Sequence, residues 1–454
     1  MVDPRIVPRA EHSISRRDID PDALKVLYRL RQYDHVAYLV GGSVRDLILG
    51  RRPKDFDIGT SAHPYQVKKL FRNCWIIGRR FRLAHVKFGN KVIEVATFRR
   101  QVAVGEEVVA DGVPAPDPTT PEGEHLIHHD NTFGTPEEDA FRRDFTINAL
   151  AYDISNFSVI DYVGGLSDLR AGVVRSIGDP DVRLREDPVR MLRAIALAAR
   201  LDFTIEPALL KAIRANRREI AKSSPPRLLE EYYKILRAGS AQKAFRSLAE
   251  LGLLEPISAE LHKGASAPLW RSLESLDAYR QQFESTPDTL SNAVLMGSLL
   301  VPLGILLHPP GVPPAPAAAG SSASDAPSRR KSRYPPGPRL GELPLARRDV
   351  ERLRLIMSLQ RRLRELSASP KAQRALAHRG MFREALTWME IHGDSPQVVE
   401  HWMAILDEGG APEPSDEGGE RQPSTPEGMP HKKRRRRRRR GRRGGGCAPP
   451  GASE

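Results

Sequence analysis

Two aspartates separated by one residue, Asp55 and Asp57, are well suited to metal chemistry in this 454-residue sequence. Residues two apart in a strand share a face, so both carboxylates are expected side by side, with Phe56 turned toward the core. Two such carboxylates suit Mg²⁺, and a pair of ions can stabilise the attacking and leaving oxygens of an in-line displacement. The spacing alone also fits a solvated strand end. A glycine turn about a dozen residues upstream favours the metal site.

That turn follows the apolar run 36–40, which predicts a short buried strand. The paired glycines let the backbone turn closely into a helix, whose first amides and dipole favour an anion. A guanidinium one turn later would add a charge-assisted contact to a phosphate. The residues expected to hold a triphosphate are Gly41, Gly42, Ser43 and Arg45.

Glu94 is a candidate third carboxylate. Residues 91–98 alternate between two faces, and Glu94 falls on a largely apolar face with Val92 and Phe98. Two interpretations are equally weighted. Glu94 either joins the aspartate pair or lies at a strand end and reaches water.

Two consecutive arginines, Arg142 and Arg143, precede another apolar segment. Such arginines could neutralise a triphosphate, and Asn148 could bond a ribose hydroxyl. Taken in isolation, the same residues fit a charged helix entry.

Asp187 and Arg190 flank the first turn of a helix that Pro188 marks. One interpretation is structural: Asp187 caps the helix, and Arg190, three residues on, is its ion-pair partner. The other is base recognition, in which the carboxylate accepts from an exocyclic amine and the guanidinium donates to a ring nitrogen. That pattern fits adenine and cytosine, does not separate them, and rejects guanine and uracil.

The elements that must position these residues are expected to be a mixture of helices and strands at first, and mainly helices later in the chain. A helix is predicted after Asp20 and another over 64–71, with strands over 83–88, 91–98 and 159–163. Residues 100–136 lose this periodicity and form a long loop, whose three histidines are expected to be solvated rather than to bind metal. Helical patterning dominates beyond residue 165. The fold class expected is therefore α+β.

Composition indicates a polyanionic partner. The net charge is +14, of which residues 431–443 hold 11 Lys or Arg, and residues 1–406 carry +10 by themselves. With only two cysteines and no secretory signal, the chain is expected in a reducing, cytoplasmic compartment. The uncharged apolar run 293–307 is too short to span a bilayer and predicts a buried helix.

The predicted organisation has a sheet-containing head followed by helical parts and a tail. Residues 309–344, rich in Pro, Ala, Ser and Gly, are expected to form a flexible insertion. The tail, an acidic spacer and an arginine-rich tract, cannot bury a core, and the tract also fits a nuclear-localisation or generic polyanion signal. The expected boundaries are 1–165 for the head, 166–230 for a helical neck, 231–308 and 345–406 for the helical body, and 407–454 for the tail.

Over residues 36–255 the sequence resembles the class II nucleotidyltransferase family, which comprises bacterial poly(A) polymerases and CCA-adding tRNA nucleotidyltransferases. The resemblance rests on three motifs in order, in the segments 41–57, 142–149 and 186–190. Within the family, residues 76–86 are similar to the segment that distinguishes the bacterial poly(A) polymerase branch, which also has arginine-rich tails. The insertion at 309–338 departs from the family pattern. The resemblance implies a head with a small mixed β-sheet, a helical neck and an RNA-binding body.

The resemblance further implies template-independent addition of AMP from ATP to RNA 3′ ends, with release of pyrophosphate and a role in RNA turnover. Mg²⁺, as two ions, is the implied cofactor, and RNA-decay proteins are implied partners. Two alternatives remain, a CCA-adding enzyme and an RNA-binding protein with an inactive head. The implied catalytic residues are Asp55, Asp57 and Glu94, with the first two as metal ligands, and the implied nucleotide-binding residues are Gly41, Gly42, Ser43, Arg45, Arg142, Arg143, Asp144, Asn148, Asp187, Arg190 and Arg193.

Overall fold

A computed structural model describes residues 3–78, 82–100, 133–305 and 338–408 of the chain. Residues 1–406 form one unit and residues 407–454 a second one. Within the described residues, no helix combines the length and the apolar character needed to cross a bilayer. The predictions for the 101–132 loop with its histidines, for residues 79–81 and for the arginine-rich tract fall outside the described residues.

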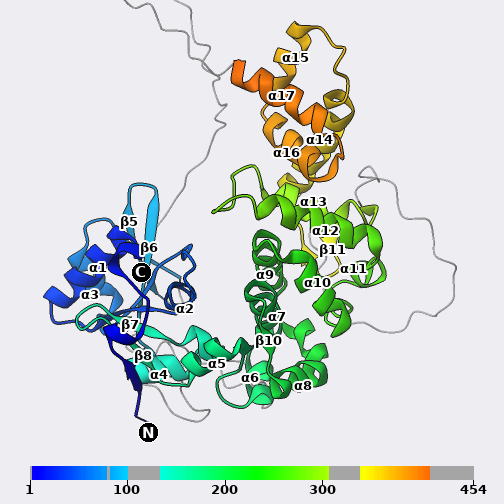
Figure 1. Cartoon of the computed structure of the whole chain (residues 1–454). Coiled ribbons are helices and arrows are strands. Elements are labelled where there is room, and N and C mark those ends of the chain that lie inside the picture. The colour runs from blue at the N-terminus through cyan, green and yellow to red at the C-terminus, as the bar shows by residue number, and fades with distance from the viewer. Residues whose placement is uncertain (1–2, 79–81, 101–132, 306–337, 409–454) are drawn as a thin grey trace, which may run out of the picture. The chain divides into compact units, whose positions relative to one another are not determined.

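An eight-stranded mixed sheet organises the N-terminal part of the chain (Figure 1). Its strand order is β1-β8-β7-β2-β3-β6-β5-β4, and β3–β6 is its parallel pair. The prediction of a mixed sheet is confirmed, although the sheet is larger than the small one expected. The strands are Arg5–Val7 (β1), Ala37–Val40 (β2), Asp57–Thr60 (β3), Cys74–Ile77 (β4), Leu83–Phe88 (β5), Lys91–Thr97 (β6), Ala151–Asp153 (β7) and Ser158–Asp161 (β8).

One face of this sheet carries the main hydrophobic core. Leu39, Ile58 and Val95 point to that face, and the helices α1 (Pro21–Gln32) and α3 (Pro64–Leu70) cover it (Figure 1). Asp20 caps α1 by accepting from the amides of Asp22 and Ala23. The opposite face has a smaller apolar cluster centred on β2, β7 and β8, which leaves polar side chains of β3 and β6 accessible.

Helices dominate from residue 165 onward, as predicted. Two short strand pairs join them: β9 (Val173–Val174) with β10 (Thr204–Ile205), and β11 (Arg339–Leu340) with β12 (Leu343–Pro344). The remaining helices are α2 (Gly42–Ile48), α4 (Pro136–Phe141), α5 (Gly165–Ala171), α6 (Pro180–Glu186), α7 (Val189–Leu201), α8 (Pro207–Asn216), α9 (Pro225–Arg237), α10 (Ala241–Glu250), α11 (Ala259–Lys263), α12 (Ala267–Arg280), α13 (Asn292–Leu300), α14 (Arg347–Leu363), α15 (Pro370–Ala377), α16 (Phe382–His392) and α17 (Pro396–Glu408), with short 3-10 turns at Arg9–Glu11, Arg16–Asp18, Thr146–Asn148 and Arg217–Lys222.

The expected flexible insertion extends too far toward the C-terminus. Of the range 309–344, the structure describes residues 338–344, and these form the β11–β12 hairpin. Leu340 and Leu343 are fully buried in the main core, so this hairpin belongs to the packed body. The uncharged run beginning at Ala293 does form a buried helix, α13. The domain boundaries themselves stay a prediction.

Candidate active site

Sheet register brings two of the predicted acids together. In the parallel β3–β6 pair Ile58 lies opposite Val95, so the preceding residues, Asp57 and Glu94, are neighbours on the other face of the sheet. Asp57 also lies opposite Val40, the last residue before the glycine turn. Glu94 therefore belongs to the open face of β6, with Val92 and Ala96, because the buried face is formed by Ile93, Val95 and Thr97. The expectation that Glu94 shares a largely apolar face with Val92 and Phe98 agrees with this alternation, and Glu94 is exposed on that face.

Asp55 lies outside β3, which begins at Asp57. The expectation that both aspartates share a strand face is therefore wrong, because Asp55 belongs to the segment that leads into the strand. It still lies near enough to act on Asp57 electrostatically. The register of β3 and β6 thus supplies an acidic neighbour of Asp57 from another strand, Glu94.

The charge state of Asp57 reflects these neighbours. The surrounding protein atoms and the carboxylates of Glu94 and Asp55 raise the pKa of Asp57 to about 6, although Arg143 opposes the shift. Asp57 is nevertheless exposed to solvent. Burial is the largest cause of this rise, and the two neighbouring carboxylates add a repulsion that a bound cation would relieve.

The donor chemistry fits Mg²⁺, which takes carboxylate oxygens together with substrate phosphates. Among the described residues, no three His, Cys, Asp or Glu side chains form a preformed metal cluster. An incomplete protein ligand set is usual for Mg²⁺, which keeps waters and substrate oxygens in its shell. Asp55, Asp57 and Glu94 are thus compatible with an ion that binds together with a nucleotide.

The glycine turn adopts a backbone conformation that requires glycine. Gly41 precedes α2 with φ 76° and ψ −133°, and its amide donates to the carbonyl of Leu150 at 3.1 Å. A Cβ at Gly41 would lie 2.9 Å from a guanidinium nitrogen of Arg143. The Gly41 amide is therefore engaged within the protein, which corrects its expected role as a phosphate donor, and Arg143 extends to the turn instead.

Ser43 and Arg45 lie beneath the turn rather than on its surface. The Ser43 hydroxyl donates to the carbonyl of Val40 at 3.1 Å, and both Ser43 and Arg45 are almost fully buried. Arg45 forms an ion pair with Asp46 at 2.7 Å and donates to the side-chain oxygen of Asn148. Burial lowers the pKa of Arg45 despite that ion pair. Arg45 and Asn148 therefore bond to each other, and the guanidinium of Arg45 is buried rather than presented to solvent.

The arginine pair 142–143 is held by a buried carboxylate. Asp139 on α4 accepts from Arg142 at 3.1 Å and from Arg143 at 3.0 Å. Burial alone would raise the pKa of Asp139, but the two guanidiniums outweigh it and lower the pKa. Arg143 also donates to the carbonyl of Asn148 at 3.2 Å. These contacts fix Arg143 beside the glycine turn, near enough to Asp57 to oppose the rise in its pKa.

Asp144 connects this segment to α7. Its two carboxylate oxygens accept from Arg190 at 2.7 Å and from Arg193 at 2.6 Å. Burial would raise the pKa of Asp144, but Arg193 and Arg190 hold it below its ordinary value. Arg193 continues the network to Glu231 on α9, at 3.2 Å.

Asp187 and Arg190 are not ion-pair partners, so that interpretation is wrong. Arg190 contacts Asp144 and Glu186, whereas Asp187 lies 2.8 Å from Arg227 on α9. Helix α7 begins at Val189, so Asp187 precedes the cap by one residue. The second carboxylate oxygen of Asp187 is buried and has no hydrogen-bond partner among the described residues. It is an acceptor that a ligand amine could satisfy.

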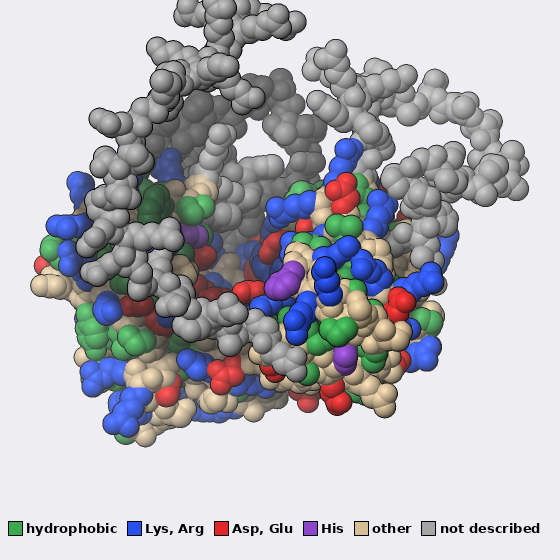
Figure 2. All heavy atoms as spheres, turned by 90° about the horizontal axis from the view of Figure 1, so that it is seen from above, with side chains coloured by type: hydrophobic (Ala, Val, Ile, Leu, Met, Phe, Trp, Pro, Cys, Tyr) green, Lys and Arg blue, Asp and Glu red, His purple; other side chains and the backbone are tan. Residues whose placement is uncertain are grey.

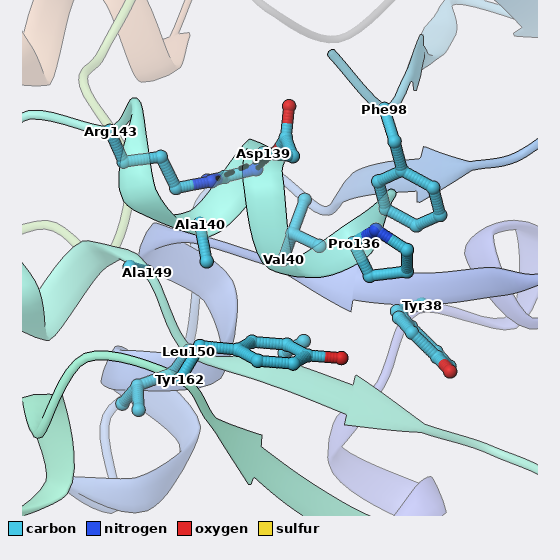
Figure 3. A pocket seen from close by; sticks show the side chains of 11 residues that line it. Tyr38, Val40, Phe98, Pro136, Asp139, Ala140, Arg143, Ala149, Leu150 and Tyr162 are labelled. Carbon is cyan, nitrogen blue, oxygen red and sulfur yellow. Dashed lines mark hydrogen bonds and ion pairs between the residues drawn. The ribbon is translucent and has the colours of Figure 1, made fainter. Parts of the chain in front are cut away.

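A small recess lies on the open side of the sheet, beneath α4 (Figure 3). Its lining is mainly apolar, from Tyr38, Phe98 and Tyr162, with Asp139 and Arg143 at one side. It has room for about one water molecule, so it is a packing defect rather than a nucleotide pocket.

The sequence interpretation missed several residues of this network. Glu186, the last residue of α6, lies 3.2 Å from Arg190 of α7, and its position four residues before Arg190 could have suggested this ion pair. Arg183 donates to the carbonyls of Arg142 at 2.6 Å and Arg143 at 2.9 Å, and nothing in its local sequence indicates this. Arg227 and Glu231 reach the site from α9, and only the tertiary fold reveals them.

Three family models match successive parts of the chain. Residues 37–175 match the poly A polymerase head domain, residues 202–264 a probable RNA and SrmB-binding site of polymerase A, and residues 339–442 the polymerase A arginine-rich C-terminus. Over these three segments the chain is therefore similar to poly(A) polymerases. This confirms the resemblance drawn from the three motifs.

Curated relatives in this family carry two names. Poly(A) polymerase I of Salmonella typhimurium is 51% identical over 253 residues, which cover 56% of this chain and 53% of the relative. Poly(A) polymerase I of Escherichia coli O157:H7 is 48% identical over 276 residues, 60% of this chain and 58% of the relative. The CCA-adding enzyme of Lactobacillus johnsonii is 35% identical over 251 residues, which cover 55% of this chain and 58% of the relative. The matches thus span little more than half of these relatives.

Solved structures of the family share the fold. A Bacillus stearothermophilus CCA-adding enzyme in complex with CTP matches with a TM-score of 0.57 and 26% identity, over 86% of this chain and 83% of that one. A Thermotoga maritima CCA-adding enzyme complexed with tRNA matches with a TM-score of 0.50 and 20% identity, over 88% of this chain and 85% of that one. The similarity extends beyond the head into the helical part.

Proposed function

We propose that this chain transfers AMP from ATP to the 3′ hydroxyl of RNA without a template and releases pyrophosphate. The observation that carries the proposal is the β3–β6 register, which places Asp57 beside Glu94 and next to the glycine turn reached by Arg143. Relatives named poly(A) polymerase I are 42–51% identical, against 35–36% for those named CCA-adding enzyme, which favours repeated AMP addition over CCA addition.

The roles follow from position and charge. Asp55 and Asp57, with Glu94 as a further ligand, would hold Mg²⁺, which supplies charge stabilisation for phosphoryl transfer. Arg143 lies beside the turn and acts electrostatically on Asp57, and it would contact the triphosphate, with Arg142 nearby on Asp139. Arg45 would act from beneath the turn, as a buried positive charge rather than a direct ligand.

Asp187 and Arg190 are proposed to read the base. The unpartnered oxygen of Asp187 would accept from the exocyclic amine of adenine, while Arg190 is positioned by Asp144. The pair alone admits cytosine as well, so the preference for ATP must arise elsewhere in the site.

The test is incubation of a short 3′-hydroxyl RNA with each nucleotide separately, with products resolved by length. ATP is expected to give long homopolymers and CTP little extension. Addition of two C and one A to a tRNA that lacks its end would instead identify a CCA-adding enzyme. No extension with any nucleotide, with RNA binding retained, would support an inactive head.

A variant of Asp57 tests the metal assignment. Asp57→Asn is expected to reduce extension by at least about a thousandfold, because a direct metal ligand is lost, while RNA affinity changes little. Asp22→Asn is the control, since Asp22 lies on α1 and contacts Lys25 at the surface. Near-native extension by Asp57→Asn would contradict the assignment.

A further inference from the structure

The open face of the sheet continues past the carboxylates to the edge strand β4. Trp75 pairs with His85, and His85 pairs with Glu94, so these side chains lie in a row that Asp57 completes. His85 contacts Glu94 directly, with 3.5 Å between the imidazole Nε2 and a carboxylate oxygen. Four adjacent strands thus carry one continuous line of side chains, from the edge of the sheet to the candidate metal ligands.

The far end of this row is apolar and uncovered. Trp75 is 53% exposed, Ile77 51% and Val92 44%, although each lies within a strand whose other face is buried. Their strand neighbours Cys74, Val86 and Ile93 point to the main core, which α3 covers. Exposed aromatic and aliphatic side chains gathered on one sheet face mark a binding surface. The face also carries the exposed Lys87, which pairs with Val92.

An aromatic ring beside a cation is the chemistry that binds single-stranded nucleic acid: bases stack on the ring and the cation meets the phosphates. Three strand spacings separate Trp75 from Asp57, which is about 14 Å. That distance corresponds to about four stacked nucleotides, and fewer in an extended strand. We propose that Trp75 is a stacking platform for a base near the 3′ end of the RNA that is extended. This inference rests on the proposed function and names a subsite for its acceptor.

Trp75 offers a direct probe of binding. Of the four tryptophans, Trp388 and Trp402 are buried, and Trp270 is partly buried with Arg246 over its ring. Titration with an oligoadenylate should therefore quench mainly Trp75, and the quenching should disappear in Trp75→Phe. An abasic site placed at each terminal nucleotide in turn should abolish quenching at one or two positions near the 3′ end. Unchanged fluorescence on addition of RNA would overturn the proposal.

Kinetics of variants provide the second measurement. Trp75→Ala should raise the KM for RNA about tenfold, with the KM for ATP and kcat little changed, while Trp75→Phe should retain most of the affinity. Tyr65→Ala is the matched control, because Tyr65 is 62% exposed on α3, at the opposite face of the sheet. If the wild type extends RNA and Trp75→Ala matches it, the subsite is wrong and the face binds another partner. If the wild type adds no nucleotide yet RNA quenches Trp75, the proposed activity fails and the RNA contact stands.

Discussion

At the scale of single residues, Gly41 combines a conformational and a steric constraint. Its φ and ψ lie in a region open essentially to glycine alone, and the space above its Cα is filled by Arg143. The sequence predicted the turn from the glycine pair. It could not predict that the Gly41 amide bonds Leu150, because that partner lies more than a hundred residues away.

Gly41→Ala should therefore lose both stability and activity. We expect the free energy of unfolding to fall by about 1–3 kcal/mol from backbone strain, and the KM for ATP to rise because Arg143 is displaced. Gly89→Ala is the control, since Gly89 also has a positive φ but no atoms lie within 4 Å of its added Cβ. Denaturant unfolding and ATP kinetics on both variants check this. Equal KM values in the two variants would mean that Arg143 is not a triphosphate ligand.

At the scale of elements, local patterns predicted most helices and strands. Pairing between distant segments determines which side chains meet at the candidate site. Alternation indicated β6, but which of its faces is buried depends on its pairing with β3 and β5. The spacing of Asp187 and Arg190 suggested a local ion pair. Asp144 and Arg227 compete for these side chains from distant segments, so sequence distance indicated the wrong partner.

Helices α13 and α16 provide a pH-dependent contact. His392 lies 3.0 Å from the hydroxyl of Ser298, and burial lowers the pKa of His392 to about 4. The unfolded chain takes up this proton near pH 6.5 and the folded chain only near 4, so stability falls as pH decreases between those values. The expected loss is at most about 3 kcal/mol.

The measurement is denaturant unfolding of the wild type and His392→Gln at several pH values. The difference between the two should shrink as pH falls from 6.5 to 4. Using the difference removes the opposite contribution of Asp277, whose pKa burial raises to about 6. A constant difference would show that His392 takes up its proton at the same pH in the folded and unfolded protein.

At the scale of the whole molecule, positive charge is concentrated in the arginine-rich tract 431–443 and is also distributed over residues 1–406. Figure 2 shows many Lys and Arg side chains on the viewed face, interspersed with acidic ones, and residues 1–406 keep a net +10 without the tail. Both the body and the arginine-rich tract are therefore expected to contact RNA phosphates.

Deletion of residues 431–454 should weaken binding to single-stranded RNA without sequence preference and shorten processive tails. The dependence of log affinity on log salt should flatten by about 0.7 for each phosphate that the tract neutralises in the full-length protein. The chemical step should survive, because the candidate site lies in the head. RNA affinity at several salt concentrations, for full-length and truncated protein, gives the answer. An unchanged slope would assign the tract to another partner.

The Asp144 network has a further consequence for nucleotide choice. Asp144 ties Arg190 and Arg193 to the segment that carries Arg142 and Arg143, and Arg183 bonds the backbone of that same segment. The network thus fixes the distance between the residues proposed to bind the base and those proposed to bind the triphosphate. A site of this kind selects nucleotides by the distance between their base and their triphosphate. Analogues whose sugar–phosphate link is lengthened should be refused even when their base is adenine.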